Sequence, residues 1–440
     1  MQAAEPKSGF VERLIEHIDA MPRAEQDMRA CEGLIVDSVA CMLGSARRGA
    51  DSAVSAWARE QPRSVSTISM RLAAASNVLE LDAMHVASSV HPGTVIVPAA
   101  LAVAWELDAS PADLVRAVLR GTQAAVMLGR STGRAHRERF QSTSTCGAFG
   151  AALACAWLYR LGTPESAGAM GLSLSTAGGL WSFVDENCDA KQWHAANAAH
   201  CGVLCAQLAG AGLQGPRRVL ESSRGFWKQL CGDAQSCELE LAGQGWAVRE
   251  VAYKPWPAPR PAHAVIAAAL QAHGRHAMQT VARVEVRTFA FAVQLLDRKQ
   301  VRSEHDARFS LQFLVTAALL LGSIGLDTFA SWDSPRMQEF MARVVVIGDT
   351  RMSERYPAHS SGSLRIVLND GSRVDHTASA APGDPECPLT DEQWEGKWDL
   401  LFGADAPCVL DDLRGSVAGG AEAPGMRDAV ERWFGAGLRA

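Results

Sequence analysis

The spacing of apolar residues predicts that the first 240 residues fold almost entirely into helices. Residues 29–44 are apolar at the intervals of one helix face, and this pattern ends at Gly44. Another helix is predicted over 111–128, with Ser110 as its N-cap and Gly129 after its end. Because strand signals are scarce in this part of the chain, we expect it to form a helical domain.

The pattern changes after Trp246, where strand signals begin to mix with helical ones. Three segments carry strand patterns: 281–290, 343–347 and 363–374. The last of these predicts a hairpin, because Asn369-Asp370-Gly371 is a typical turn sequence. A helical stretch over 309–321 lies among them. The predicted fold class is therefore mainly α with a smaller α+β domain.

A chain of 440 residues is too long for one ordinary core, which favours two domains. Helical patterns return at 390–401 and 426–434, so the C-terminal tail is expected to pack on the first domain. We predict a helical domain built from residues 1–267 together with 395–440. The α+β lid domain is predicted over 268–394.

Composition excludes several classes of protein. The net charge is −6 with no basic run, which argues against nucleic-acid binding. The longest uncharged runs are rich in Ala, Gly, Ser and Thr, so we expect buried helices and no membrane span. The 11 cysteines form no CxxC pair, which predicts reduced thiols and no metal cluster. The charged N-terminus shows no signal-peptide pattern, and a cytoplasmic location is expected.

One local design occurs four times: a short polar loop runs directly into a helix of small residues. The four stretches are 88–102, 141–156, 191–206 and 254–270. Helix starts offer backbone N–H groups that bind anions. Together the stretches suggest one site for a small carboxylated molecule.

The loop before the first of these helices contains Asp82, His85 and His91. Pro92 suits the first turn of a helix, so His91 is expected at or near the N-cap. A helix start next to a histidine favours an anion beside it. The alternative is a capping histidine with solvated acids.

The second and third stretches offer hydroxyl groups and two titratable side chains. Ser142, Thr143 and Ser144 could form a carboxylate cradle, although ordinary helix capping would explain them equally. Lys191 and His194 are spaced to share a helix face, where a lysine beside a histidine could titrate near neutral pH. The alternative for this pair is a surface lysine beside a packed histidine.

The fourth stretch places Lys254, Arg260 and His263 among four prolines. Two cations beside a helix start could neutralise a dicarboxylate, although an interdomain linker with surface charges would have the same composition. Taken together, the four stretches suggest proton transfer next to a carboxylate without a metal. The candidate acids and bases are His91, Lys191, His194 and His263.

These stretches resemble the MmgE/PrpD family, whose members include 2-methylcitrate dehydratase, cis-aconitate decarboxylase and iminodisuccinate epimerase. The matching text is HPGTVIVPAALA, STSTCGAFGAALA, the K-x-x-H of KQWHAANAAHCG, KPWPAPRPAH, DARFSLQFLVTAALLLG and PGDPECPLTDEQWEGKW, in the family's order. The resemblance implies a homodimer, cofactor-independent chemistry on small di- or tricarboxylates, and a site in the cleft between the helical domain and an inserted α+β lid.

The resemblance also assigns roles to individual residues. The catalytic residues correspond to Asp82, His91, Lys191 and His263. Glu80 is an alternative to Asp82 as the position of the acidic residue. We expect the substrate-binding set to be His85, Gln141, Ser142, Thr143, Ser144, His194, Lys254 and Arg260.

Two positions depart from the family pattern. Gln141 stands where relatives commonly have a histidine, and Phe313 stands where the decarboxylase has a tyrosine. These departures keep three functions open. The leading one is a lyase of the dehydratase or decarboxylase type, the second is an epimerase or isomerase of an amino- or hydroxy-dicarboxylate, and the third is a non-catalytic carboxylate-binding protein.

Overall fold

The fold was examined in a computed structural model of the chain, which describes residues 9–50, 52–186, 188–232, 241, 245–419 and 423–435. It divides into two compact units. Unit 1 comprises residues 1–78, 82–251 and 404–440, and unit 2 comprises residues 79–81 and 252–403. The chain therefore enters unit 2 twice, once for only three residues. The expected division into a helical domain and a lid stays a prediction.

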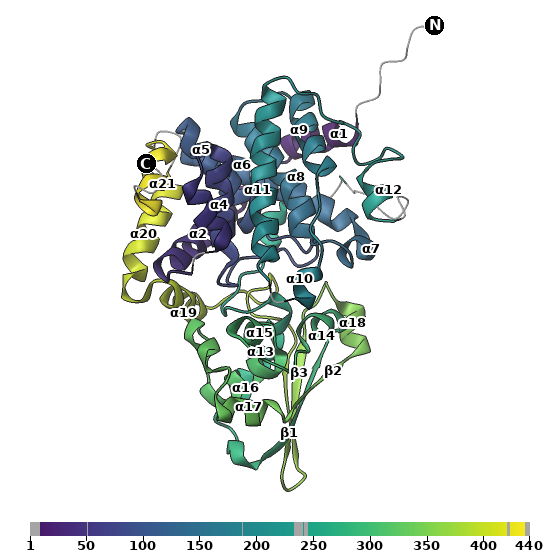
Figure 1. Cartoon of the computed structure of the whole chain (residues 1–440), viewed down its shortest axis with the longest axis vertical. Helices are drawn as coiled ribbons and strands as arrows, with labels where there is room; N and C mark the ends of the chain where they lie inside the picture. Colours follow the sequence, from purple (N-terminus) through teal and green to yellow (C-terminus); the bar gives the residue numbers. More distant parts are fainter. Residues whose placement is uncertain are drawn as a thin grey trace. The chain divides into compact units, whose positions relative to one another are not determined.

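Unit 1 is helical throughout the residues that the structure describes, apart from isolated β-bridges. Its helices are α1 (Phe10–Ala20), α2 (Glu25–Arg47), α3 (Ala53–Glu60), α4 (Val65–Asn77), α5 (Pro92–Leu107), α6 (Pro111–Ser131), α7 (Gly133–Arg137), α8 (Ser142–Leu158), α9 (Thr163–Ser175), α10 (Ser182–Asp185), α11 (Ala190–Gly210), α12 (Phe226–Leu230), α20 (Ala406–Val417) and α21 (Met426–Phe434). The long α11 runs beside α4 and α8 (Figure 1).

Small residues allow the central helices of unit 1 to approach each other closely. A Cβ built on Gly150 of α8 would lie only 2.3 Å from the carbonyl oxygen of Gly121 on α6. Because any larger side chain would push these helices apart, the small-residue text of α8 is a packing requirement. All residues of α8 except Trp157 are buried, which matches its uncharged sequence.

Helix starts follow the sequence more closely than helix ends do. The Ser110 hydroxyl accepts a hydrogen bond from the Asp113 N–H and caps α6, as predicted. The predicted ends at Gly44 and Gly129 are wrong, because α2 and α6 continue to Arg47 and Ser131. A Cβ on Gly129 would lie 2.8 Å from the Ser88 Cβ, so this glycine serves close packing within the helix.

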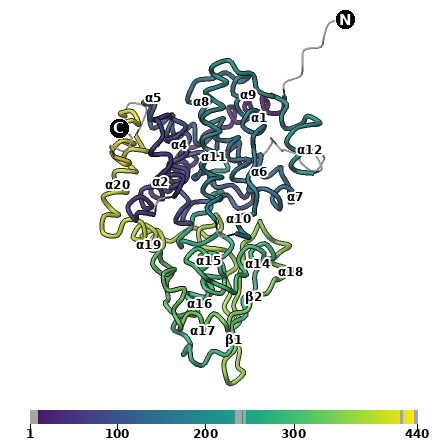
Figure 2. The backbone as a smooth tube through the Cα atoms, viewed as in Figure 1, coloured from purple at the N-terminus to yellow at the C-terminus, as the bar shows by residue number. Residues whose placement is uncertain are grey.

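The helices α20 and α21 belong to unit 1, whereas α19, which covers most of the predicted helical stretch 390–401, belongs to unit 2. α20 packs against α2 and α21 packs against α5, which Figure 2 shows as the yellow end of the tube beside purple and blue helices. The unit thus joins both ends of the described chain in one core.

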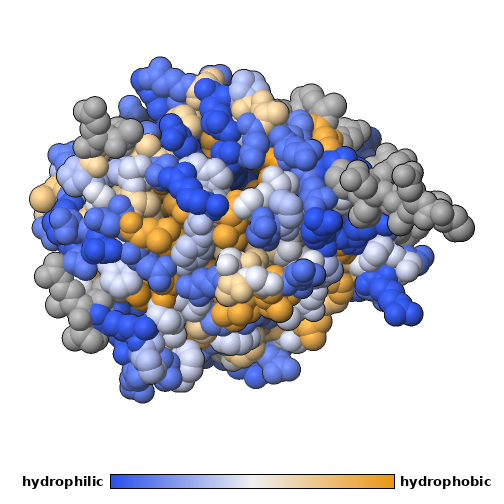
Figure 3. All heavy atoms as spheres, turned by 90° about the horizontal axis from the view of Figure 1, so that it is seen from above, coloured by the Kyte–Doolittle hydropathy of each residue, from blue (hydrophilic) through white to orange (hydrophobic). Residues whose placement is uncertain are grey.

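No helix among the described residues is long and apolar enough to cross a membrane. In the view of Figure 3, hydrophilic side chains surround smaller groups of apolar ones.

Unit 2 is built on a four-stranded mixed sheet in the order β2-β1-β3-β4. The strands are β1 (Val281–Thr288), β2 (Val344–Gly348), β3 (Gly362–Leu368) and β4 (Arg373–Ala378). β1 pairs in parallel with β2 and antiparallel with β3, and β3 and β4 form the predicted hairpin. The three predicted strand segments are confirmed, although residue 290 already lies in a helix.

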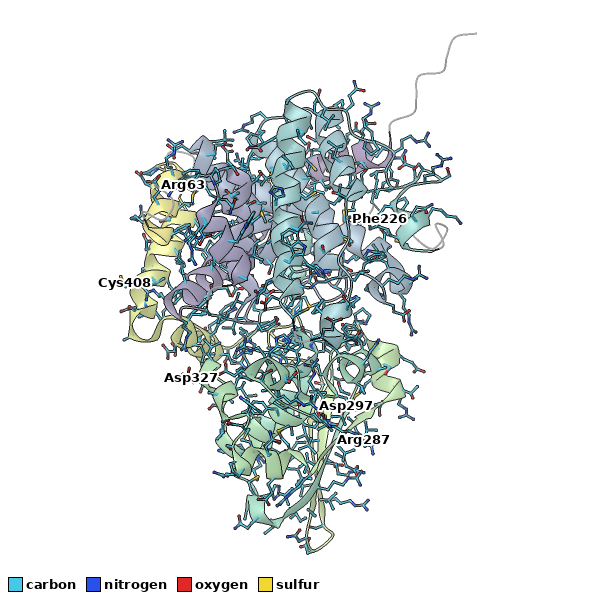
Figure 4. All side chains as sticks on the ribbon, viewed as in Figure 1. Arg63, Phe226, Arg287, Asp297, Asp327 and Cys408 are labelled. Atoms are coloured by element: carbon cyan, nitrogen blue, oxygen red, sulfur yellow. The ribbon has the colours of Figure 1, made fainter. Side chains whose placement is uncertain are left out.

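The helices of unit 2 are α13 (His263–Ala272), α14 (Ala290–Leu296), α15 (Glu304–Arg308), α16 (Leu311–Leu321), α17 (Pro335–Met341), α18 (Thr350–Arg355) and α19 (Asp391–Phe402). α13 and α16 pack on the sheet and share an apolar core with it (Figure 1). Ser310 caps the start of α16 by accepting the Phe313 N–H, and Gln312 in its first turn donates to Asp297, labelled in Figure 4, at 2.5 Å. The fold is thus mainly α with a smaller α+β part.

Candidate active site

Asp82 and His91 form a buried pair in unit 1. The Nδ1 of His91 lies 2.7 Å from Oδ2 of Asp82 and 3.1 Å from the carbonyl oxygen of Ala83. The His91 side chain is 12% exposed and the Asp82 side chain only 3%. Because both neighbours of Nδ1 are acceptors, this nitrogen carries a proton, and Nε2 is the ring nitrogen that can take up or release one.

The pair is held by the first turn of α5, as the sequence suggested. His91 is the N-cap of α5 and Pro92 begins the helix, but the imidazole makes no capping bond. One turn into the helix, the Thr94 hydroxyl donates to Oδ2 of Asp82 at 2.9 Å. Thr94 therefore orients the carboxylate that orients the histidine. Sequence reasoning missed this residue, although it lies in the HPGT text.

Asp82, and not Glu80, is the acid that reaches His91. Glu80 faces Lys254 within unit 2, with Oε2 and Nζ 3.3 Å apart. Glu80 also adopts a left-handed backbone with φ of 56°, which is unfavourable for a residue other than glycine. The geometry thus favours Asp82 over Glu80 as the acid next to His91.

The start of α8 meets the His91 region directly. The Thr143 hydroxyl oxygen accepts the backbone N–H of His91 at 3.1 Å. Ser142 is buried and its hydroxyl has no hydrogen-bond partner among the described residues. Ser144 is buried next to Gly179, whose positive φ of 116° and close approach leave no room for a Cβ. The three hydroxyl residues of the predicted cradle therefore gather at one helix start.

Gln141 and His194 form a second pair at the same helix start. Gln141 is the N-cap of α8, and its side-chain oxygen accepts from Nδ1 of His194 at 2.8 Å. Burial lowers the pKa of His194 below its ordinary value. The edge of the His194 ring packs against Phe183 of α10, with ring centroids 5.6 Å apart.

Lys191 lies one turn before His194 on α11, so the predicted shared helix face is consistent with the structure. Its side chain is half-buried. His85 is also in unit 1 but has a different environment. Its Nδ1 accepts from the backbone N–H of Ser88 at 3.2 Å, and burial lowers its pKa. These contacts favour a structural role for His85 in the loop before α5.

Lys254 is fully buried within unit 2 and pairs with Glu80. A second fully buried lysine, Lys397 of α19, donates to the carbonyl oxygen of Leu81 at 2.9 Å. Buried lysines are rare because their charge loses its hydration. Two of them therefore hold the three-residue segment 79–81. Lys397 lies in the DEQWEGKW text, but no local pattern there predicts that it is buried.

Arg260 is buried and engages one turn of unit 2. Its guanidinium donates to the carbonyl oxygens of Pro382 at 2.7 Å and Ala381 at 3.1 Å, and it forms an ion pair with Asp384. Burial raises the pKa of Asp384 despite this pair. These contacts favour a role for Arg260 in holding the turn, while substrate binding by Arg260 stays a prediction.

His263 begins α13 and is completely buried in unit 2. Its Nε2 donates to the carbonyl oxygen of Ala258 at 3.0 Å, while Nδ1 has no partner among the described residues. Burial first, and then the charge of Arg260, hold the pKa of His263 well below its ordinary value. His263 is therefore a neutral imidazole whose lone pair lies on Nδ1.

Two further expectations concern Phe313 and metals. Phe313 is fully buried in the core of unit 2 and stacks on Phe329 at 5.9 Å, which accounts for its apolar side chain. Within the described part of the chain, no three His, Cys, Asp or Glu side chains gather in a way that could hold a metal ion.

Comparison with known proteins gives matches along most of the chain. The family model described as the MmgE/PrpD N-terminal domain matches residues 14–238, and the MmgE/PrpD C-terminal domain matches residues 256–407. The cis-aconitate decarboxylase of Homo sapiens is 28% identical over 341 residues, covering 72% of this chain and 68% of the relative. The cis-aconitate decarboxylase of Mus musculus is 26% identical, covering 72% and 67%. A cis-aconitate decarboxylase-like protein of Aspergillus oryzae is 24% identical over 368 residues, covering 76% and 74%.

Proposed function

Because this chain belongs to the MmgE/PrpD family, we propose that it is a lyase that acts on a small di- or tricarboxylate without a cofactor. The similarity to cis-aconitate decarboxylases supports a polycarboxylate substrate. The observation that carries the proposal is the buried Asp82–His91 pair, whose geometry suits a general acid–base group. The homodimer and the cytoplasmic location expected from the sequence stay predictions.

The proposed step is proton transfer at the carbon next to a substrate carboxylate. Nε2 of His91 is the nitrogen that takes up or delivers a proton in this step, while Asp82 keeps the Nδ1 proton in place and balances the imidazolium. The electron pair of the broken C–H bond spreads onto the carboxylate. The N-terminal end of α8, whose dipole is positive, lies at the Thr143 contact and favours that negative charge. As that electron pair forms a carbon–carbon double bond, the hydroxyl group on the neighbouring carbon takes a proton from a histidine of the site and leaves as water.

The same pair can serve decarboxylation, in which the bond to the carboxylate breaks first and the proton is transferred afterwards. Loss of CO₂ leaves an electron pair on carbon, and a protonated His91 returns a proton to it. Both reactions need the Asp82–His91 pair, and they differ in the bond that breaks. The choice between them depends on the substrate.

A second candidate function is an epimerase or isomerase of an amino- or hydroxy-dicarboxylate. The observation that favours it is the second imidazole, His194, at the same helix start as His91. An epimerase removes a proton from one face of a carbon and returns one to the other face. Two imidazoles could perform these two transfers.

The experiment that tests the proposal is incubation of the protein in D₂O with cis-aconitate, hydroxy-tricarboxylates and amino-dicarboxylates, followed by ¹H NMR. The lyase predicts loss of water or CO₂ from one substrate. Deuterium incorporation with unchanged composition would favour the isomerase. Measurable binding without exchange or turnover across the panel would contradict both and support a non-catalytic carboxylate-binding protein.

A further inference from the structure

Two histidines of unit 1 form hydrogen bonds with the first turn of α8. The backbone N–H of His91 binds the Thr143 hydroxyl, and the ring of His194 binds Gln141. Gln141 and Thr143 are only two residues apart, at the N-cap and the second residue of α8. The start of α8 therefore binds two histidines that are 103 positions apart in the sequence, one through its backbone and one through its ring.

The two rings share the same tautomer but have different partners. In each ring Nδ1 faces an acceptor oxygen: a carboxylate of Asp82 at His91, and the amide oxygen of Gln141 at His194. An amide oxygen only accepts, so it selects the Nδ1–H form of a neutral imidazole and leaves the lone pair on Nε2. The neutral amide brings no counter-charge, unlike the carboxylate at His91.

The surroundings of His194 also favour a neutral ring. Burial is the cause that lowers its pKa. The ring faces Phe183 of α10, Gly179 and the Gln141 amide, with Lys191 one turn earlier on its own helix. A base must be unprotonated at the working pH, which this apolar and amide environment provides.

From this geometry we infer that His194 is a second proton-transfer group of the site and that Gln141 is its positioning residue, selecting Nε2 as the reactive nitrogen. The inference rests on the proposed function for its chemistry. Nε2 of His194 takes the proton from the carbon next to the carboxylate, and the electron pair moves onto that carboxylate. Nε2–H of His91 delivers the other proton, to the leaving hydroxyl or to the opposite face of the carbon.

This division of work matters because the reaction classes differ in the number of proton carriers that they need. Decarboxylation needs one donor to the carbon after CO₂ leaves. Dehydration and epimerisation each need one group that removes a proton and another that delivers one. A working His194 therefore points toward a substrate with a hydrogen on the carbon next to its carboxylate.

The closing experiment measures the tautomer and the pH profile in the same set of variants. In protein labelled with ¹⁵N-histidine, long-range ¹H–¹⁵N correlation should show His194 protonated at Nδ1, assigned by loss of its signals in His194→Gln. Gln141→Ala should mix the two tautomers and lower kcat about tenfold with little change in KM, as expected for one neutral hydrogen bond. Gln141→Glu should restore the Nδ1–H form and move the acidic limb of the kcat/KM profile to higher pH, because a carboxylate stabilises the imidazolium.

The control is His200→Gln on the same helix, which should leave kcat, KM and the pH profile unchanged. A wild-type His194 protonated at Nε2, or a tautomer and pH profile that Gln141→Ala and Gln141→Glu leave unchanged, would overturn the inference. The tautomer is measured without substrate, so it tests the role of Gln141 even if no polycarboxylate is turned over. Melting temperatures near that of wild type would show that the variants are folded.

Discussion

The titratable side chains of the two units are buried in different ways. In unit 1, His91 and His194 both face acceptor oxygens through Nδ1, which leaves Nε2 to carry protons. In unit 2, Lys254 and Arg260 are buried with their charges against Glu80 and Asp384. The first arrangement suits groups that change their protonation, and the second suits groups that must keep it.

This comparison teaches that burial of a charged residue is a weak sign of catalysis. A buried ion pair must be well paired to be tolerated at all, whatever its function. The orientation of an imidazole by acceptors at one ring nitrogen is a more specific sign of catalysis, because it makes the other nitrogen the reactive one. On this criterion the oriented imidazoles, His263 of unit 2 included, are stronger catalytic candidates than the buried cations Lys254 and Arg260.

The largest expected effect comes from breaking the Asp82–His91 pair. His91→Gln should lower kcat/KM about 10²–10⁴-fold, the usual contribution of a general acid–base group. Asp82→Asn should give a loss of similar order, because its amide can present a donor to Nδ1 and favour the wrong tautomer. Steady-state kinetics on the substrate found in D₂O would measure both. Glu80→Gln is the matched control, and a larger loss of kcat there would assign the acid to Glu80.

The next effect is on stability in unit 2. Arg260→Met should lower the free energy of unfolding by about 3–5 kcal/mol, because it leaves Asp384 buried without its partner. The double variant Arg260→Met/Asp384→Leu should recover part of this loss. Urea denaturation measures both values. A rise in KM with unchanged stability would instead support the substrate-binding role predicted from the sequence.

A pH effect of intermediate size is expected from buried structural histidines. Burial lowers the pKa of His136 to about 4, and its ring packs against Phe226, labelled in Figure 4, at 5.5 Å. The unfolded chain binds this proton near pH 6.5, so the stability contribution is complete above that pH and is lost as the pH falls toward 4. The loss amounts to about 3 kcal/mol, at 1.36 kcal/mol per unit of pKa.

Denaturation curves at several pH values between 7 and 4 would measure this loss. His136→Gln, which can keep a hydrogen bond to Thr145, should flatten the dependence in that window. His263 in unit 2 also has a lowered pKa, so part of the slope should remain. An unchanged slope in His136→Gln would mean that His136 is not the group responsible.

The smallest expected effect is at Thr94. Thr94→Val removes the hydroxyl that donates to Asp82 and keeps the shape of the side chain. We expect kcat to fall roughly tenfold, in line with about 1.5 kcal/mol for a hydrogen bond to a charged group. The same kinetic assay measures it. A loss as large as that of Asp82→Asn would show that the carboxylate cannot be oriented without Thr94.

Much of the fold could be predicted from the sequence because its signals are local. Alternation predicted β1, and the Asn369-Asp370-Gly371 turn predicted the β3–β4 hairpin. Pro92 and Ser110 marked helix starts, since capping depends on adjacent residues. The helices continue past Gly44 and Gly129, and at Gly129 the glycine permits close packing against Ser88 within the helix.

The sequence by itself determined which residue types the chain offers and at which helix starts they stand. His91 before Pro92 and Gln141 before the Ser/Thr run were already fixed as neighbours of α5 and α8. The tertiary structure alone decided the pairings: Asp82 with His91, and Gln141 with His194. The physical reason is that helix signals act within a few residues, whereas hydrogen bonds between distant residues depend on how the helices pack.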